Sequence, residues 1–386
     1  MSAVGTAAVG ATADVPIAIA AESEVRTAAG GSRRRFHPLT IARIDPLCSG
    51  DGAAAAVTLV VPVELATEFD FRAGQWLTVR RFVDGREERR SYSLCSPAGD
   101  PPRIGVREVL GGAVSRWLIR VLRPGDVVEV QAPSGSFTPD VSTGGRHALI
   151  GAGSGITPLL SIAATLLGQP DSEVVLLYGN RHAHSVMFAD EIADLKDAHP
   201  TRFQLNHVLS REPQEVELFS GRMDKSKLRS LLPATTAVAS VDHWWLCGPL
   251  GMIVDAVEVL SELGVNPDRI HRELFYVGEP PPEVEHPEDV AAPGAVTQVT
   301  VMLDGRTSTT PIPRTSTVLE GAQRVRPDLP FACKGGVCGT CRARVTAGQV
   351  RMRRNFALER AELEAGFVLT CQSVPVTDEL TVDFDS

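Results

Sequence analysis

The sequence of 386 residues contains no run of about 18 consecutive apolar residues, so we expect no membrane-spanning helix. It also lacks an excess of basic residues, with 38 Lys and Arg against 47 Asp and Glu and a net charge of −9. This balance argues against nonspecific binding to nucleic acid, which needs a basic surface. Cysteines are few and odd in number, seven in all. A secreted disulfide framework would have an even number, so we expect a cytoplasmic protein.

Residues 1–34 lack a hydrophobic pattern of their own and are rich in Ala, Gly, Thr and Ser. We expect a disordered leader there. The stretch "SRRRF" (Ser32 to Phe36) superficially resembles the start of a twin-arginine export signal. It lacks the apolar stretch that should follow, so export is not expected.

The pattern of residues along the rest of the chain changes at three points. Residues 35–142 alternate short β-type runs with turn signals, which predicts a β-barrel or a β-sandwich, and of the two we expect an antiparallel β-barrel. Residues 143–276 alternate apolar strands with helical segments, which predicts an α/β domain with a parallel sheet. Residues 277–296 hold five prolines and five acids without Lys or Arg, as an extended linker would. A small cysteine-bearing domain, 297–386, should follow.

The last domain contains four cysteines spaced C-x4-C-x2-C, followed after 29 residues by the fourth. Thiolates favour zinc, copper or iron–sulfur centres. Zinc modules usually place their ligands in two pairs, whereas three ligands in one loop with a lone fourth is the spacing of plant-type [2Fe–2S] ferredoxins. A zinc site and four unrelated buried cysteines are the alternatives. The glycines in the loop permit tight turns and close N–H groups. The predicted cluster ligands are Cys333, Cys338, Cys341 and Cys371.

A second motif, Arg90-Ser91-Tyr92-Ser93, ends a strand of the expected barrel. It resembles the flavin motif of the ferredoxin–NADP reductase superfamily. Arg90 can pair with a pyrophosphate, Tyr92 can stack on the flavin ring, and Ser93 can contact its polar edge. Ordinary strand packing is the alternative explanation of Tyr92.

A third motif, Gly112 to Ser115, opens a helix after the barrel strand that contains Val106. In the superfamily this Gly-x-x-Ser segment holds the flavin phosphates with backbone N–H groups at the helix N-terminus. The resemblance therefore implies FAD contacts from Val106, Gly112, Val114 and Ser115.

The nicotinamide half begins with "GAGSGITP" (Gly151 to Pro158), between a strand and a helix. It is not the dinucleotide fingerprint, but it resembles the pyrophosphate loop of the superfamily and implies roles for Gly151, Gly153 and Gly155. In the same way Thr157 would lie where flavin and nicotinamide meet.

A Cys-Gly-Pro turn, Cys247-Gly248-Pro249, follows the last long apolar strand. The resemblance places it beside the nicotinamide, and a small core residue is the alternative for Cys247. It also places Glu273 and Phe275 by the flavin. The predicted catalytic residues are Ser93, Thr157, Cys247 and Glu273.

Two strand ends suggest NADPH rather than NADH. Asn180 and Arg181 follow one strand and Ser210 and Arg211 follow the next. Arginine accepts a 2′-phosphate, whereas an acid would favour the ribose diol of NADH. Solvated surface arginines are the alternative.

Taken together, the residues after 35 resemble the oxygenase reductases built from a flavin barrel, a nicotinamide domain and a C-terminal β-grasp ferredoxin. Within this class, "CKGGVCGTCRARV" and "MRRNFALERAELEAGFVLTCQSVP" most resemble the reductase subunits of phenylacetyl-CoA epoxidase. The resemblance implies electron transfer from NADPH through FAD and a [2Fe–2S] cluster to a multi-subunit di-iron oxygenase. Reductases of Rieske-type hydroxylases, such as ketosteroid 9α-hydroxylase, are the alternative.

Rival classes are a free-standing oxidase, a disulfide reductase, and a metal-stabilised adaptor without redox activity.

A further expectation concerns the basic run "RMRRNF", with Arg351, Arg353 and Arg354. It should face an acidic surface of the oxygenase, unless it is only a solvated loop.

Overall fold

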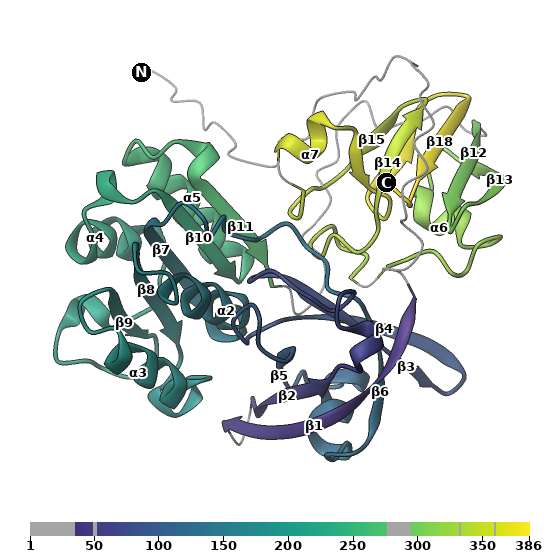
Figure 1. The fold of residues 1–386 in the computed structure, drawn as a ribbon. Coiled ribbons are helices and arrows are strands. Elements are labelled where there is room, and N and C mark those ends of the chain that lie inside the picture. Colours follow the sequence, from purple (N-terminus) through teal and green to yellow (C-terminus); the bar gives the residue numbers. More distant parts are fainter. Residues whose placement is uncertain (1–34, 49–51, 276–294, 332, 359) are drawn as a thin grey trace, which may run out of the picture. The chain divides into compact units, whose positions relative to one another are not determined.

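The computed structural model describes residues 35–48, 52–275, 295–331, 333–358 and 360–386. The expected leader, residues 1–34, and all but the last two residues of the expected linker 277–296 lie outside this part of the chain. The described residues form two compact units, one within Ser32–Gly278 and one within Glu279–Ser386. The barrel and the α/β domain expected from the sequence are therefore packed as a single unit (Figure 1).

The first half of the larger unit is an antiparallel barrel in the strand order β4-β3-β6-β1-β2-β5. Bulky residues at alternate positions of these strands fill its core, as the period of two requires. The barrel closes where the Cys95 N–H donates to the Arg103 carbonyl oxygen at 2.7 Å. The strands are β1 Phe36–Cys48, β2 Ala54–Val60, β3 Trp76–Val83, β4 Arg86–Ser93, β5 Arg103–Arg107 and β6 Val127–Gln131.

A short helix, α1 (Ala113–Arg116), follows β5 and continues into a π-turn over Trp117–Val121. Gly112 is its N-cap residue. Val114 and Leu118 point into the barrel core, which fixes this connection against the strands.

The second half is a parallel sheet in the order β11-β10-β7-β8-β9. From β7 the chain builds outward through β8 and β9, then returns to β10 and β11 on the other side. The strand order therefore reverses between β7 and β10, and ligands of open α/β sheets bind at the carboxyl ends of such a pair. The strands are β7 Gly145–Ala152, β8 Ser172–Asn180, β9 Phe203–Leu209, β10 His243–Gly248 and β11 Ile270–Leu274.

Four helices cover this sheet, α4 and α5 on one face and α2 and α3 on the other (Figure 1). Helix α2 is buried along almost its whole length, because one core joins it to the sheet and to the barrel residues Ala54 and Ala56. This explains why its sequence is apolar all round rather than on a single stripe. The helices are α2 Ile156–Leu167, α3 Ala189–Ala198, α4 Lys225–Thr235 and α5 Leu250–Glu262.

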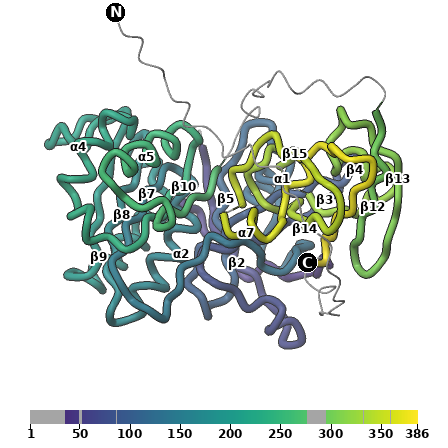
Figure 2. Tube along the Cα trace, turned by 90° about the horizontal axis from the view of Figure 1, so that it is seen from above, coloured from purple at the N-terminus to yellow at the C-terminus, as the bar shows by residue number. Residues whose placement is uncertain are grey.

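The smaller unit is a five-stranded mixed sheet in the order β13-β12-β18-β14-β16, with a separate β15-β17 pair. Strands β12 and β18 are parallel neighbours, and α6 packs across the sheet as in a β-grasp fold. The elements are β12 Val296–Leu303, β13 Arg306–Pro313, α6 Val318–Ala322, β14 Arg342–Ala347, β15 Val350–Met352, α7 Arg360–Glu364, β16 Phe367–Leu369, β17 Ser373–Pro375 and β18 Glu379–Asp383. Figure 2 labels β12 to β15 and α7 along the chain trace.

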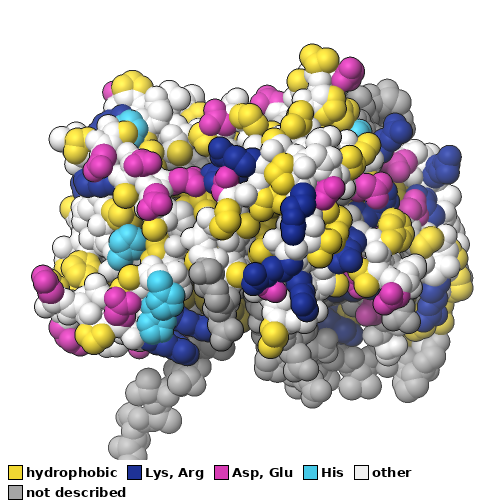
Figure 3. All heavy atoms as spheres, turned by 90° about the horizontal axis from the view of Figure 1, so that it is seen from below, with side chains coloured by type: hydrophobic (Ala, Val, Ile, Leu, Met, Phe, Trp, Pro, Cys, Tyr) yellow, Lys and Arg dark blue, Asp and Glu magenta, His cyan; other side chains and the backbone are white. Residues whose placement is uncertain are grey.

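The surface carries charges of both signs. On the face shown in Figure 3, Lys and Arg side chains are interspersed with Asp and Glu. In the part of the chain that the structure describes, no helix is both long and apolar enough to cross a membrane.

Candidate functional site

Three of the four residues predicted to be catalytic come together at the carboxyl ends of the sheet strands. The Ser93 hydroxyl, at the end of β4, donates to a Glu273 carboxylate oxygen at 3.2 Å. Glu273 in β11 is the register partner of Cys247 in the parallel neighbour β10. A barrel strand and two sheet strands therefore build one cluster.

The environment of this cluster raises two pKa values. Burial raises the pKa of Glu273 to about 8, although the hydrogen bond from Ser93 opposes the rise. Burial, and then the charge of Glu273, raise the pKa of the Cys247 thiol well above its ordinary value. Cys247 is therefore a neutral thiol near pH 7 and a poor nucleophile. Glu273 holds its proton near neutral pH and can exchange it through the adjoining hydroxyl.

Thr157, the fourth predicted catalytic residue, lies where the barrel meets the α/β half. It is fully buried in the first turn of α2, and its hydroxyl donates to the Ser154 carbonyl oxygen at 3.0 Å. Its methyl carbon would lie 2.3 Å from a Cβ placed on Gly105 of β5. The structure thus places Thr157 against the barrel wall rather than in hydrogen bonding to the Ser93–Glu273 pair.

The two glycine turns predicted to bind the nucleotide, at the ends of β7 and β10, are in contact where the strand order of the sheet reverses. A Cβ on Gly155 would lie 2.2 Å from the Cys247 carbonyl oxygen, so only glycine permits this approach. Gly248, with a φ of +155°, leads into Pro249, the N-cap of α5. Gly151 lies within β7 and Gly153 in the turn that follows it, where the Tyr178 hydroxyl donates to the Gly153 carbonyl oxygen at 2.9 Å.

Phe275, which the resemblance places by the flavin, is fixed by the same turn. Its N–H donates to the Gly248 carbonyl oxygen at 3.0 Å. The side chain is half-buried and packs against the core shared by the barrel and the α/β half.

Two of the predicted flavin residues of β4, Arg90 and Tyr92, lie on one face of that strand, and Ser93 lies on the other. Arg90 forms a 3.0 Å ion pair with Glu88 and keeps about half of its side chain exposed. Tyr92 is half-buried against the barrel core, and burial raises its pKa while the Arg90 charge opposes the rise. The guanidinium and the phenol ring are therefore close enough to act on one ligand.

The side chains of the other residues predicted to contact the flavin support the fold of the barrel. Those of Val106 and Val114 are buried in the barrel core. The Ser115 hydroxyl accepts from the Val109 N–H at 3.1 Å and so supports its own loop. Phosphates at this turn would be held by the N–H groups that follow Gly112.

The residues predicted to select the nicotinamide cofactor are adjacent at the ends of β8 and β9. The Ser210 N–H donates to the Asn180 carbonyl oxygen at 2.8 Å, and the Arg211 N–H to the Arg181 carbonyl oxygen at 2.9 Å. Asn180 is buried, whereas Arg181 and Arg211 are exposed and open to a ligand phosphate.

Sequence reasoning missed an acid at this same position. Glu212 accepts a hydrogen bond from the Ala183 N–H at 2.9 Å and lies 4.0 Å from the His182 ring. It follows Arg211 directly, so the signal was available in the sequence. The ends of β8 and β9 thus combine arginines, which suit a 2′-phosphate, with a carboxylate, which suits a ribose diol.

In the smaller unit the four predicted ligands form two pairs. Hydrogen bonds link the thiols of Cys333 and Cys338, and those of Cys341 and Cys371. No group of three or more His, Cys, Asp or Glu side chains is arranged around a single ion in the described residues. Two thiol pairs match the need of a [2Fe–2S] cluster, in which each of two irons takes two cysteine ligands.

The loop around these thiols also fits an anionic cluster. The hydrogen bond from Cys338 lowers the pKa of Cys333 to about 6, helped by backbone N–H groups. Among these, the Gly335 N–H lies 3.3 Å from the Cys333 sulfur. Sequence reasoning missed Gln372, whose side-chain N–H donates to the Lys334 carbonyl oxygen at 2.9 Å and lies 3.8 Å from the Cys371 sulfur. It joins the lone fourth ligand to the loop of the other three.

The prediction of an exposed basic docking patch is wrong for Arg354. Arg354 is only 6% exposed, and its carbonyl oxygen would lie 3.3 Å from a Cβ on Gly336. Its segment is packed against the cysteine loop, as the hydrogen bond from the Phe356 N–H to the Gly336 carbonyl oxygen confirms. Arg353 is half-buried and donates to the Thr315 carbonyl oxygen at 3.2 Å. The run therefore supports the loop from within the unit.

Comparison with known proteins matches three families along the chain. The models describe an oxidoreductase FAD-binding domain over residues 54–138, an oxidoreductase NAD-binding domain over 149–258, and a 2Fe-2S iron-sulfur cluster binding domain over 301–376. The chain is also similar in fold to phthalate dioxygenase reductase, with a TM-score of 0.53 and 24% identity over 90% of this chain and 98% of that one.

Two curated relatives match nearly end to end. A subunit of the 1,2-phenylacetyl-CoA epoxidase of Escherichia coli is 40% identical over 91% of this chain and 98% of its own length. The ferredoxin reductase component of the 3-ketosteroid-9-alpha-monooxygenase of Rhodococcus rhodochrous is 34% identical over 85% and 92%. The chain therefore belongs to the ferredoxin–NADP reductase type of oxygenase reductases with a C-terminal [2Fe–2S] domain, and it is an NAD(P)H-dependent flavin and iron–sulfur oxidoreductase.

Proposed function

We propose that this protein is the reductase of a multi-subunit di-iron oxygenase that acts on phenylacetyl-CoA, with NADPH as the electron source. The observation that carries this proposal is the 40% identity to a component of the Escherichia coli 1,2-phenylacetyl-CoA epoxidase across 98% of that component. A cytoplasmic location remains a prediction from the cysteine count.

The predicted site residues have two kinds of role, cofactor binding and proton exchange. Arg90 and Tyr92 would hold FAD at the barrel strand, and the glycine turn after β7 would hold the nucleotide pyrophosphate. The Cys-Gly-Pro turn at the end of β10 would lie beside the nicotinamide. When bound, FAD supplies an acceptor for two electrons that can release them singly, and the cluster carries them one at a time. The protein needs this conversion because an oxygenase takes electrons one by one.

The three residues Ser93, Cys247 and Glu273 would surround the position where hydride passes from NADPH to the flavin. The neutral Cys247 thiol and the protonated Glu273 carboxyl keep negative charge away from a ring that is to become more negative. Ser93 holds the carboxyl in place through the 3.2 Å hydrogen bond. The thiol pairs Cys333–Cys338 and Cys341–Cys371 would each hold one iron.

Reconstitution tests the proposed partner. The purified chain, NADPH and an epoxidase core lacking its own reductase should convert phenylacetyl-CoA to its epoxide in aerated buffer, where O₂ supplies the oxygen atom. The same chain with the oxygenase component of a ketosteroid 9α-hydroxylase should give little product. The reverse preference would support the second candidate, which rests on the 34% identity to the Rhodococcus rhodochrous reductase component.

A further inference from the structure

Strand β5 presents two different faces to the two halves of the larger unit. Ile104 and Val106 are buried in the barrel core. The alternate residues Arg103, Gly105 and Arg107 all contact the α/β half instead. Because side chains alternate along a strand, one β-strand can serve as barrel wall and as docking edge.

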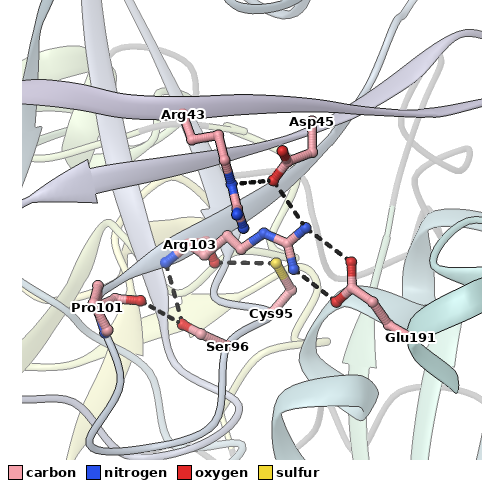
Figure 4. Close-up of polar contacts among 7 residues, drawn as sticks. All are labelled: Arg43, Asp45, Cys95, Ser96, Pro101, Arg103 and Glu191. Carbon is pink, nitrogen blue, oxygen red and sulfur yellow. Dashed lines mark hydrogen bonds and ion pairs between the residues drawn. The ribbon is translucent and has the colours of Figure 1, made fainter. Parts of the chain in front are cut away.

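The first of these contacts is an ion pair between the halves. Arg103 donates to both carboxylate oxygens of Glu191 in α3, at 2.7 and 2.8 Å, and its guanidinium also lies 3.3 Å from Asp45 of β1 (Figure 4). The Arg103 side chain is only 13% exposed. Bidentate pairs of this kind fix orientation as well as distance. The pair borders a cleft of about 610 Å³ between the barrel and the α/β half.

The second contact requires the absence of a side chain. A Cβ on Gly105 would lie 2.3 Å from the Thr157 methyl carbon and 3.0 Å from the Phe188 ring. The φ of Gly105 is not in the left-handed region, so its conformation does not demand glycine. Glycine is needed here because it lets the first turn of α2 approach the barrel. Beyond it, Arg107 donates to the Ser185 carbonyl oxygen at 3.0 Å.

The neighbouring strand repeats the pattern. Ala54 and Ala56 of β2 belong to the core shared with α2, whereas Val57 and Leu59 fill the barrel. Small residues on the docking side of both strands thus bring the two halves close together.

These contacts are connected to the site at both ends. On the α/β side, Thr157 follows the turn in which Gly155 touches the Cys247 backbone, and Cys247 adjoins Glu273. On the barrel side, the Arg103 carbonyl oxygen accepts from the Cys95 N–H, two residues after Ser93. A shift at β5 would therefore change the position of Glu273 relative to Ser93.

We propose that Arg103 and Gly105 are positioning residues for hydride transfer. The Arg103–Glu191 ion pair and the bare backbone of Gly105 set the separation of the flavin-binding barrel from the nicotinamide domain. Neither residue belongs to the cluster of Ser93, Cys247 and Glu273. A misplacement of about 1 Å in such a geometry can slow a reaction by about 10²-fold.

Glu191→Gln in the holoenzyme tests the ion pair, and Glu262→Gln is the matched control. Glu262 also forms a bidentate pair, with Arg229 at 2.7 and 2.8 Å, but this pair lies entirely between α4 and α5. Stopped-flow absorbance would give the limiting rate of flavin reduction by NADPH, and titration with NADP⁺ would give binding. We expect Glu191→Gln to slow the limiting rate about tenfold with NADP⁺ affinity unchanged, because the arginines after β8 and β9 are untouched. Glu262→Gln should match the parent.

Hydrogen–deuterium exchange of the NADPH-free holoenzyme gives a second readout. Backbone amides of β5 and of α3 should exchange faster in Glu191→Gln than in the parent or in Glu262→Gln. An unchanged limiting rate, or an equal slowing by both substitutions, would overturn the proposal. So would a loss of NADP⁺ affinity as large as the loss of rate.

Gly105→Ala tests the close approach independently. The added methyl group should slow flavin reduction more than tenfold, about 10²-fold for a shift of 1 Å, while FAD content stays near the parent value. Adding Thr157→Ser removes the methyl carbon that the new Cβ meets, so the double variant should be faster than Gly105→Ala alone. A double variant no faster than the single one would contradict the proposal. If Gly105→Ala does not fold, the Glu191 and Glu262 comparison still decides it.

Discussion

The Ser93 hydroxyl and the Glu273 carboxylate, 180 positions apart, are joined by a 3.2 Å hydrogen bond. This bond connects β4, at one end of the strand order of the barrel, with β11, the edge strand of the parallel sheet. Burial raises the pKa of Glu273 to about 8, so the proton on this carboxyl can be exchanged close to neutral pH.

Glu273 should control the pH dependence of flavin reduction. Below about pH 8 the carboxyl is neutral; above it, the carboxylate opposes the arrival of a hydride. The limiting rate with NADPH should therefore fall as the pH rises through about 8. Glu273→Gln, which keeps the size of the side chain but does not titrate, should give a flat profile in stopped-flow measurements.

Ser93→Ala refines the same test. The hydrogen bond from Ser93 lowers the pKa of Glu273, so its removal should move the fall in rate to higher pH. A profile with the same midpoint in the parent and in both variants would assign the titration to another group.

The raised pKa of Glu273 should also appear in the stability. Its ordinary value is 4.5, and in the folded chain it is about 8. Between these values the folded chain keeps a proton that the unfolded chain has released, so the free energy of unfolding falls as the pH rises. Urea unfolding of the holoenzyme at about pH 6 and about pH 8 should show a larger loss in the parent than in Glu273→Gln. Equal losses would mean that the carboxyl is already ionised in the fold.

Cys371→Ser should remove the reduced-cluster EPR signal and leave ferricyanide reduction by NADPH largely intact. Cys371 is the pair partner of Cys341, so its loss would leave one iron with a single thiolate from the chain. Cys48→Ser is the matched control, because Cys48 lies in β1 and donates to the Gly52 carbonyl oxygen. An intact rhombic signal in Cys371→Ser would exclude Cys371 as a ligand.

Contiguous motifs were readable from the sequence, because each one places its chemistry within a single turn or strand. The spacing of Cys333, Cys338 and Cys341 and the Arg90–Ser93 motif are of this kind. The three-part fold was readable for another reason, because the alternation of strand, helix and turn patterns changes along the chain. The role of Gly105 was not readable. Nothing in the local pattern distinguishes a glycine needed for docking from one needed for a turn, since the difference depends on Thr157, which packs against it from another domain.

The prediction that Arg354 belongs to an exposed basic run was wrong for a related reason. Charge runs are usually solvated, but a guanidinium can be buried where the chain supplies partners and aliphatic packing. Arg354 is buried because its segment lies against the cysteine loop. Gln372 was equally inaccessible to a motif search, because its contact with Lys334 spans 38 positions.

Cofactor preference should depend on Arg211 and Glu212, which have opposite effects. A charge-assisted hydrogen bond to a 2′-phosphate contributes roughly 1.5–3 kcal/mol, so Arg211→Ala should raise the KM for NADPH at least about tenfold and barely affect NADH. Glu212 carries the charge that repels a phosphate and suits the ribose diol, so Glu212→Gln should improve NADPH relative to NADH. Steady-state ferricyanide reduction with each cofactor measures both ratios. The control is Arg229→Ala, because Arg229 pairs with Glu262 between α4 and α5. If Arg211→Ala weakens NADPH and NADH equally, the arginine supports the loop between β9 and α4 rather than the phosphate.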